Sequence, residues 1–360
     1  MQGCSWTAGV LAGVFTRRGT GASLRPVRGP RVLALALTLL LAACIPTVQR
    51  AGSLIDYNAP RFDVASERFT SFDGAELGLS AWLPPEGQQP TAVVIALHGM
   101  NDYAGAFYLA GPWFAERGVA FYAYDARGFG RSPRRGVWAG ERLMTEDLRT
   151  AVTVARRAHP GASVAVIGDS MGSAAAIAAF GSDDPPAADR LILVAPAVWG
   201  WSTLPDAYAL TLWVGAHTFP WRAVSPPRNV TRSRTASDNR QELLRAGRDP
   251  NMIWSTRIDA VYGLVGLMER ASQRAANLNG DVLYLYGAHD QIIPHTSAVA
   301  AARRLPQSAR TAYYENGYHW LLRDLQREIV YADVLAFIND PDAPLPSNAR
   351  SLLPVVQANR

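Results

Sequence analysis

Five consecutive residues, Gly168-Asp169-Ser170-Met171-Gly172, place a serine in the order G-x-S-x-G. They follow the apolar run 163–167, which is typical of a buried strand, and precede the small-residue stretch 173–180, which favours a helix. A strand, a sharp turn and a helix with the serine at the apex form a nucleophile elbow. Glycines are needed on either side because a side chain there would meet the neighbouring strand or helix. The pattern predicts that Ser170 is a nucleophile.

A nucleophilic serine also needs a base to take its proton and a third group to orient that base. His319 lies in a segment between the predicted last strand and the last helix, and Asp290 lies in the loop after the predicted strand 281–286. The chain order serine, acid, histidine is the one that accompanies an elbow of this kind. We therefore expect His319 to be the base and Asp290 to be the acid.

Other residues of the same types fit these roles less well. Asp169 points away from the serine side of an elbow, and Asp281 begins its strand at the wrong end of the sheet. His289 and His295 lie on the loop of the acid, and His159 lies at a helix end. His217 lies within 197–273, and His98 lies beside the expected oxyanion turn. They stay weaker candidates for the base.

Acyl transfer develops a negatively charged oxygen, so hydrogen-bond donors must already point at it. One donor is expected from the backbone N–H of Met171, the residue after the nucleophile. The other is expected from the loop His98-Gly99-Met100, where glycine allows close approach and the N–H of Met100 is the donor.

The remaining pattern alternates apolar strands with helices. This rhythm predicts a mainly parallel sheet covered by helices on both faces. A hairpin is expected over 67–83 with its turn at Asp73-Gly74. Further expected strands are 91–97, 118–124, 163–167, 190–196, 281–286 and 309–315, and expected helices include 144–158 and 327–338.

The rhythm is interrupted over 197–273, which holds half of the ten tryptophans of the chain. This segment falls after the elbow and between two core strands, so we expect a lid or cap there. The sequence thus divides into a leader (1–43), a tether (44–62), a core (63–196 and 274–340), the lid (197–273) and a flexible tail (341–360).

The chain has no lysine, and its 35 basic residues are all arginine. Five of these precede residue 44, where no acidic residue occurs, which leaves 30 arginines against 30 acidic residues in the remainder. That balance argues against a nucleic-acid partner, which requires a basic surface.

The leader combines arginines with a short apolar run, 32–41, that is too short to span a bilayer. It ends in Leu41-Ala42-Ala43-Cys44, which resembles the lipobox of bacterial lipoproteins. The resemblance implies cleavage before Cys44, lipidation of this cysteine and anchorage to the cell envelope, on the outer membrane if the source is Gram-negative. An ordinary cleaved secretory signal is the alternative. Since Cys4 is the only other cysteine, no disulfide or cysteine metal site is expected in the mature domain.

Taken in order, several motifs resemble those of the monoacylglycerol lipase and lysophospholipase group, the serine aminopeptidase S33-like α/β-hydrolases. They are His98-Gly99-Met100, the stretch 124–132, the elbow, the Asp290 loop and Gly317-Tyr318-His319-Trp320. The resemblance implies an α/β-hydrolase fold with a mainly parallel eight-stranded sheet and a helical lid. It implies the same catalytic and oxyanion residues and ester substrates with an acyl chain. Two positions depart from the family, which usually has histidine at Asp169 and glycine at Ser173.

We therefore expect a serine hydrolase that cleaves monoacylglycerol-like or lysophospholipid-like esters through an acyl-enzyme on Ser170, with no metal or organic cofactor. An acyltransferase or peptidase using the same residues is one alternative. A non-catalytic lipid-binding envelope protein is another, although none of the three catalytic residue types is missing.

Overall fold

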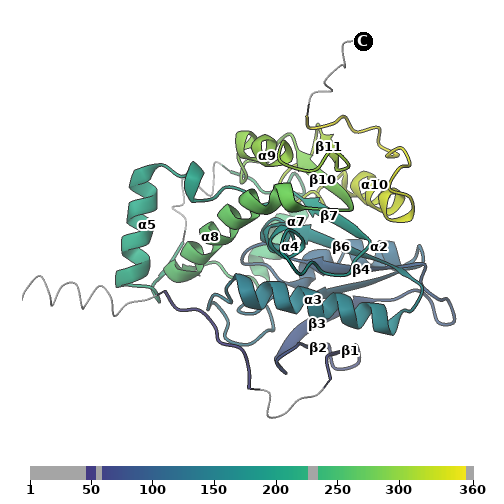
Figure 1. Ribbon diagram of the computed structural model, residues 1–360, viewed down its shortest axis with the longest axis horizontal. Helices are drawn as coiled ribbons and strands as arrows, with labels where there is room; N and C mark the ends of the chain where they lie inside the picture. The colour runs from purple at the N-terminus through teal and green to yellow at the C-terminus, as the bar shows by residue number, and fades with distance from the viewer. Residues whose placement is uncertain (1–45, 54–58, 226–233, 354–360) are drawn as a thin grey trace, which may run out of the picture. The chain divides into compact units, whose positions relative to one another are not determined.

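A single large sheet organises the molecule (Figure 1). The computed structural model describes residues 46–53, 59–225 and 234–353. In this part of the chain, nine strands pair in the order β1-β2-β3-β5-β4-β6-β7-β10-β11. Their bounds are β1 (Arg61–Asp63), β2 (Arg68–Thr70), β3 (Glu76–Trp82), β4 (Ala92–Leu97), β5 (Val119–Tyr124), β6 (Ser163–Asp169), β7 (Arg190–Val194), β10 (Asp281–Gly287) and β11 (Arg310–Tyr314).

The six strands from β5 to β11 are parallel, whereas β1, β2 and β3 pair antiparallel. All six residues of β4 and all six of β5 are buried, which explains why these strands read as continuous apolar runs. The predicted hairpin is confirmed as β2 and β3. The sheet has nine strands rather than the expected eight, because the short edge strand β1 is added. Its Phe62 stacks on Tyr122 with ring centroids 4.7 Å apart.

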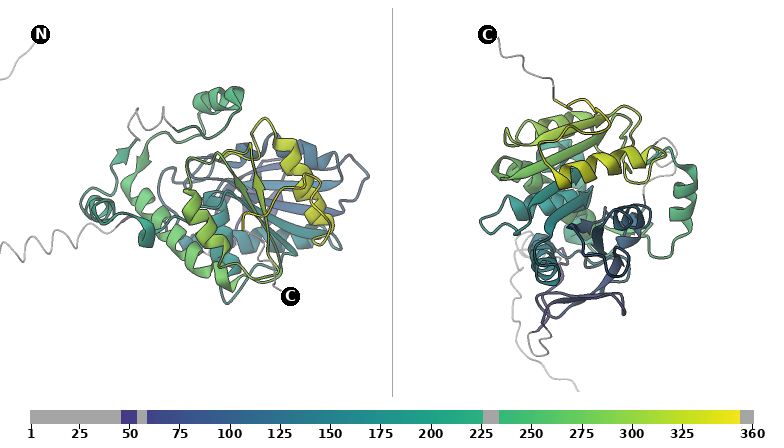
Figure 2. Two further views of the ribbon diagram at one scale, coloured as in Figure 1. Left: turned by 90° about the horizontal axis from the view of Figure 1, so that it is seen from above. Right: turned by 90° about the vertical axis from the view of Figure 1, so that its right-hand side faces the viewer.

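Helices cover both faces of the sheet, as predicted (Figure 1, Figure 2). One face packs against α3 (Glu141–Ala158), α4 (Met171–Phe180), α8 (Ile258–Arg274) and α9 (His295–Ala302). The other face packs against η2 (Ala104–Phe107), α2 (Ala110–Ala115) and α10 (Arg327–Asn339). Every residue of α4 is buried, so the helix behind the serine is held from all sides.

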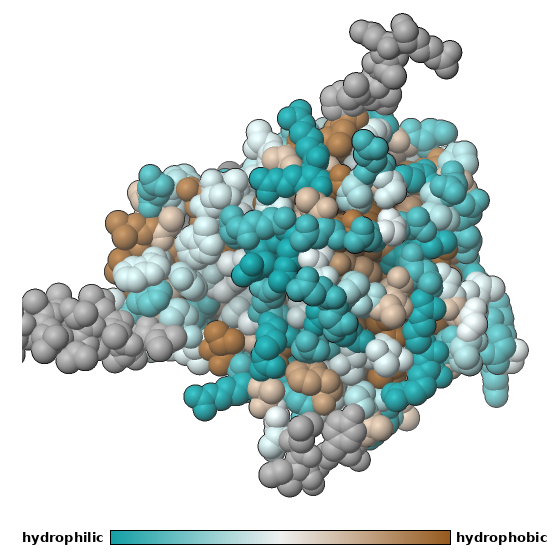
Figure 3. Space-filling model, in the orientation of Figure 1, coloured by the Kyte–Doolittle hydropathy of each residue, from teal (hydrophilic) through white to brown (hydrophobic). Residues whose placement is uncertain are grey.

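The segment between β7 and β10 contains most of the remaining elements. They are η3 (Trp201–Thr203), α5 (Asp206–Thr218), β8 (Ala223–Val224), α7 (Arg240–Arg248), β9 (Thr256–Arg257), α8 and η4 (Ala275–Asn277). Helix α8 packs along α4 and buries Leu267 and Met268 against the core. Helix α5 exposes Tyr208 and Leu210, and Figure 3 shows apolar side chains where α5 lies in Figure 1.

Both ends of the described chain make contacts that local sequence patterns do not reveal. In the segment predicted as a tether, the side chain of Gln49 donates a hydrogen bond to Val137 O at 2.7 Å. In the segment predicted as a flexible tail, Leu345 and Leu352 are buried and Arg350 forms a bridge with β11. Residues 341–353 therefore pack against the core, because two leucines find apolar partners there.

The stretch after β5 forms a buried ion cluster. Arg127 donates two hydrogen bonds to each of two carboxylates, Asp73 and Asp147, at 2.7–2.8 Å. All three side chains are at most 3% exposed. This cluster ties the β2–β3 turn to α3, so Arg127 has a structural role.

Candidate active site

Ser170 lies at a strained apex between β6 and α4. Its backbone has φ 52° and ψ −109°, a conformation that residues other than glycine rarely adopt. A Cβ at Gly168 would lie 2.5 Å from Ser173 Cα, and one at Gly172 would overlap the carbonyl of Leu97. The two glycines thus let strand, turn and helix come close enough to present the serine, as the sequence predicts.

Ser173 departs from the family pattern without disturbing the elbow. Its hydroxyl donates to Gly168 O at 2.6 Å and accepts from Val194 N at 3.1 Å. The added side chain therefore bridges β6 and β7 instead of crowding them.

Ser170, His319 and Asp290 form one hydrogen-bonded relay. His319 Nε2 lies 3.0 Å from Ser170 Oγ, and His319 Nδ1 lies 2.8 Å from Asp290 Oδ2. The other oxygen of Asp290 accepts from the backbone N–H groups of Ile292 and Ile293 at 2.8 and 2.9 Å, which fixes the carboxylate. The structure thus brings together the three residues that the sequence predicted.

Burial alone would lower the pKa of His319, but the charge and hydrogen bond of Asp290 raise it above its ordinary value. Asp290 therefore orients the imidazole and stabilises its protonated form. His319 is 5% exposed, so the relay is shielded from bulk water.

The expected oxyanion donors lie beside the serine. Met171 is the first residue of α4, where a backbone N–H has no partner within the helix. Met100 belongs to a tight turn in which Asp102 N donates to Gly99 O at 3.2 Å. A Cβ at Gly99 would lie 3.4 Å from Ser170 Cβ, so this turn passes close to the nucleophile.

A cavity of about 620 Å³ opens at the relay. Ser170, Met100 and Met171 are among the residues that line it. Helices α5 and α8 supply most of its walls, through side chains that include Leu212, Leu264, Val265 and Met268. None of the described residues that line it is charged. The cavity can accommodate an apolar chain whose reactive end meets the serine.

The remaining histidines lie outside the relay. His98 Nδ1 lies 2.7 Å from Gly99 O, and its Nε2 accepts from Ala126 N at 2.9 Å, so its role is structural. His159 lies at the end of α3, as expected, and its Nε2 lies 2.9 Å from the hydroxyl of Tyr122. Burial lowers the pKa of both imidazoles.

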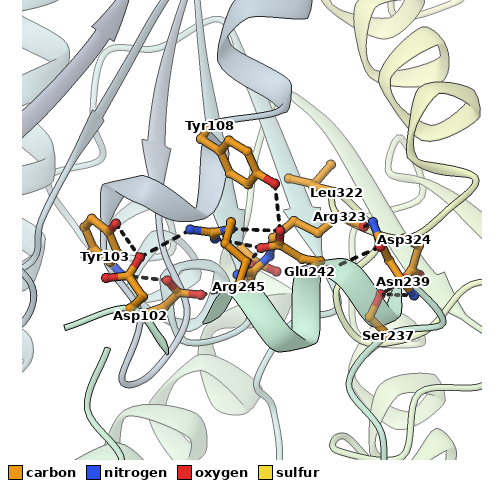
Figure 4. A network of polar contacts seen from close by, with 12 residues as sticks. Asp102, Tyr103, Tyr108, Ser237, Asn239, Glu242, Arg245, Leu322, Arg323 and Asp324 are labelled. Carbon is orange, nitrogen blue, oxygen red and sulfur yellow. Dashed lines mark hydrogen bonds and ion pairs between the residues drawn. The ribbon is translucent and has the colours of Figure 1, made fainter. Parts of the chain in front are cut away.

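The sequence did not reveal a buried polar network next to the relay (Figure 4). Its centre is Arg323, whose guanidinium lies 2.8 Å from Asp102 and 3.8 Å from Glu242 on α7. The residues come from three distant segments and form no motif. The sequence offers one weak signal, which is that Arg323 directly follows the apolar run 320–322.

The predicted leader and Cys44 lie outside the described residues. Within the part of the chain that the structure describes, no helix combines the length and apolarity needed to cross a membrane.

Comparison with known proteins places this geometry in a family. The model of the family described as serine aminopeptidase, S33, matches residues 88–326. The chain belongs to this family. It is thus a serine hydrolase with the α/β-hydrolase fold, as predicted.

Relatives in this family include lipases. A monoacylglycerol lipase of Mycolicibacterium smegmatis is 27% identical over 275 residues, which cover 75% of this chain and 95% of that protein. A monoglyceride lipase of Rattus norvegicus is 24% identical, covering 70% of this chain and 82% of that protein.

Solved structures share the fold. A monoacylglycerol lipase of Paleococcus ferrophilus matches with a TM-score of 0.61 and 19% identity, covering 73% of this chain and 98% of that one. A carboxyl esterase of Bacillus coagulans, in complex with glycerol, matches with a TM-score of 0.63 and 20% identity, covering 76% of this chain and 96% of that one.

Proposed function

We propose that the protein is a serine ester hydrolase that cleaves carboxylic esters of acyl chains, of monoacylglycerol or lysophospholipid type. The observation that carries this proposal is the opening of the Ser170–His319–Asp290 relay into an uncharged cavity of about 620 Å³. The lipases among the relatives support the same substrate class.

In the first half of the reaction, Ser170 Oγ attacks the ester carbonyl while His319 Nε2 takes the hydroxyl proton. The carbonyl oxygen becomes negative and accepts hydrogen bonds from the N–H groups of Met100 and Met171. His319 then gives its proton to the leaving alcohol as the ester C–O bond breaks. The acyl group remains on Ser170.

In the second half, a water molecule attacks the carbonyl of the acyl-enzyme while His319 takes a proton from that water. Collapse of the second intermediate returns that proton to Ser170 Oγ and releases the carboxylic acid. Asp290 holds Nδ1 of His319 at 2.8 Å and stabilises the imidazolium that forms.

The uncharged cavity favours ester hydrolysis over aminopeptidase activity. An aminopeptidase must bind the ammonium group at the start of a peptide, and a carboxylate is the usual partner of such a cation. The described cavity wall offers no carboxylate and is mostly apolar. We assign this wall to the acyl chain and assign α5 and the adjoining segment to a lid that covers it.

The proposal predicts that Ser170→Ala lowers the turnover of monoacylglycerols at least about 10⁴-fold without unfolding the protein. A matched control is Ser182→Ala, which alters another serine just beyond the far end of α4 and should retain full activity. Turnover by Ser170→Ala near that of Ser182→Ala would refute the assignment.

We also propose that the protein is held at the bacterial cell envelope by lipid on Cys44, because the sequence before this cysteine resembles a lipobox. Two or more acyl chains would anchor it stably to a membrane surface. Mass spectrometry of the mature N-terminus tests this. An unmodified N-terminal peptide that begins after a different cleavage site would contradict it.

A further inference from the structure

Arg323 is a buried cation that the mechanism above does not use. It lies four residues after His319, in the loop that leads to α10, and is 2% exposed. Its guanidinium stacks on the ring of Trp320 at 3.8 Å from the centroid. A charge buried this deeply is tolerated only when opposite charges surround it.

Three carboxylates surround this guanidinium, and each comes from a different element. Asp102 lies 2.8 Å away, Glu242 lies 3.8 Å away and Asp169 lies 3.9 Å away. Figure 4 shows Arg323 with the first two of these. Glu242 is held in turn by Arg245 on α7 at 2.7 Å.

Two of these aspartates lie in segments that form the reacting site. Asp102 closes the turn that carries Met100, because its backbone N–H donates to Gly99 O. Asp169 directly precedes Ser170. Arg323 itself continues the loop that carries His319. One guanidinium therefore connects the oxyanion turn, the elbow and the base.

The charge of Asp169 is unfavourable where it stands. Its Oδ2 lies 3.9 Å from the position of a Cβ on Gly99, and its buried Oδ1 has no hydrogen-bond partner within the described residues. An ionised carboxylate next to the oxyanion turn opposes the formation of a negative oxygen on the substrate. A cation beside this carboxylate, such as Arg323 at 3.9 Å, reduces that opposition.

We propose that Arg323 is a positioning residue that holds the Met100 turn against the base loop and offsets the charge of Asp169 as the oxyanion forms. This inference rests on the ester hydrolysis proposed above. It gives the unusual aspartate beside the nucleophile a defined partner.

The same arrangement has a consequence for the titration of His319. Asp169 raises the pKa of His319, and Arg323 lowers it. Burial raises the pKa of Asp169 to about 6, with Arg323 acting in the opposite direction. Asp290 after β10, Asp169 at the end of β6, and Arg323 and Asp324 on its own loop act on His319 directly. Asp102 in the turn after β4 and Glu242 on α7 face Arg323.

Steady-state kinetics of the full chain with p-nitrophenyl butanoate test the proposal. We expect Arg323→Met to lower kcat by about 10²-fold with little change in KM, because the loss falls on the transition state. We expect Arg323→Lys, which keeps the charge, to recover part of this loss. The control Arg117→Met removes another arginine stacked on a tryptophan, 3.7 Å from the centroid but 40% exposed, and should retain wild-type kcat.

The double variant Asp169→Asn/Arg323→Met separates this role from a structural one. Of the carboxylates that Arg323→Met leaves without this cation, Asp169 is the one that directly precedes the nucleophile, so removing its charge should restore kcat at least about tenfold over Arg323→Met. The double variant also buries one unpaired carboxylate fewer than Arg323→Met, so it remains informative if Arg323→Met fails to fold. In Asp169→Asn alone, the acid limb of the kcat/KM profile should move to lower pH.

The inference is overturned if the double variant is no faster than Arg323→Met. If Arg323→Met does not fold, the inference is overturned when the acid limb of Asp169→Asn does not move. Failure of the proposed function has a different signature, because Ser170→Ala would then remain active. If Ser170→Ala loses activity while Arg323→Met keeps the wild-type kcat, the role of Arg323 is refuted and the proposed function stands.

Discussion

The cavity wall makes a quantitative prediction about acyl-chain selectivity. Leu212 on α5 lines the cavity, whereas Leu210, two residues earlier on the same helix, is 64% exposed. Leu212→Asn therefore places an amide of similar size in the acyl site, and Leu210→Asn makes the same change on the outer surface. The pair separates an effect on the cavity from an effect on α5 itself.

The magnitude follows from apolar burial. Each buried methylene contributes about 0.8 kcal/mol, or about fourfold in kcat/KM. Four additional methylenes between a butanoate and an octanoate ester therefore give the wild type a preference of up to about 200-fold. An amide without partners in that wall costs about 1–3 kcal/mol, so Leu212→Asn should reduce the octanoate preference by about 5- to 150-fold.

The assay compares kcat/KM for p-nitrophenyl butanoate and octanoate, below the concentration at which the longer ester aggregates. We expect Leu210→Asn to keep the wild-type ratio and Leu212→Asn to lose most of it. An unchanged ratio in Leu212→Asn, or an equal loss in both variants, would show that the acyl chain does not occupy this cavity.

Three further predictions concern the relay, the elbow and the core. In a pH–rate series, the activity of the wild type should fall as the pH drops through a value above the ordinary pKa of histidine, because His319 must be neutral to act as base. Asp290→Asn should lower kcat about 10⁴-fold and move this acid limb to lower pH. Gly172→Ala should prevent folding or remove activity, because its Cβ would overlap the last carbonyl of β4. The control Gly247→Ala on α7 adds a Cβ that meets no atom within 4 Å, so it should raise the free energy of unfolding in urea by up to about 1 kcal/mol. Arg127→Met leaves two buried carboxylates unpaired and should lower the free energy of unfolding by about 3–5 kcal/mol in the same measurement, and a loss below 1 kcal/mol would contradict the assigned pairing.

The elbow and the relay could be predicted because their requirements are local. Gly168 and Gly172 are dictated by the close approach of adjacent segments, and this constraint is visible within five residues of sequence. The strands β4, β5 and β6 are buried on both faces, so their apolar runs identify them directly. The acid and the base then follow from their places after the last two strands, β10 and β11.

Contacts between distant segments could not be predicted in this way. Arg127 is buried and paired with Asp73 and Asp147, but nothing local in the sequence selects these two partners. The docking of 341–353 depends on Leu345 and Leu352 finding apolar surface on the finished core. Such partners become apparent only when the sheet has brought the segments together.

The network around Arg323 illustrates the same limit at the site itself. Asp102, Glu242 and Arg323 lie in three segments that have no common motif. The sequence showed that Asp169 departs from the family pattern, but not which residue compensates its charge. Only the three-dimensional arrangement connects this departure to a cation on the base loop.

The central claim is that Ser170 Oγ is a nucleophile activated by His319, and covalent labelling tests it most directly. A fluorophosphonate should attach stoichiometrically to the native chain and to no site in Ser170→Ala. Because the chain has no lysine, trypsin releases the label within peptide 158–190, where fragment masses distinguish Ser170 from Ser163, Ser173 and Ser182. The account predicts a single adduct on Ser170. A folded protein that stays unlabelled, or that carries the label on another residue, would contradict it.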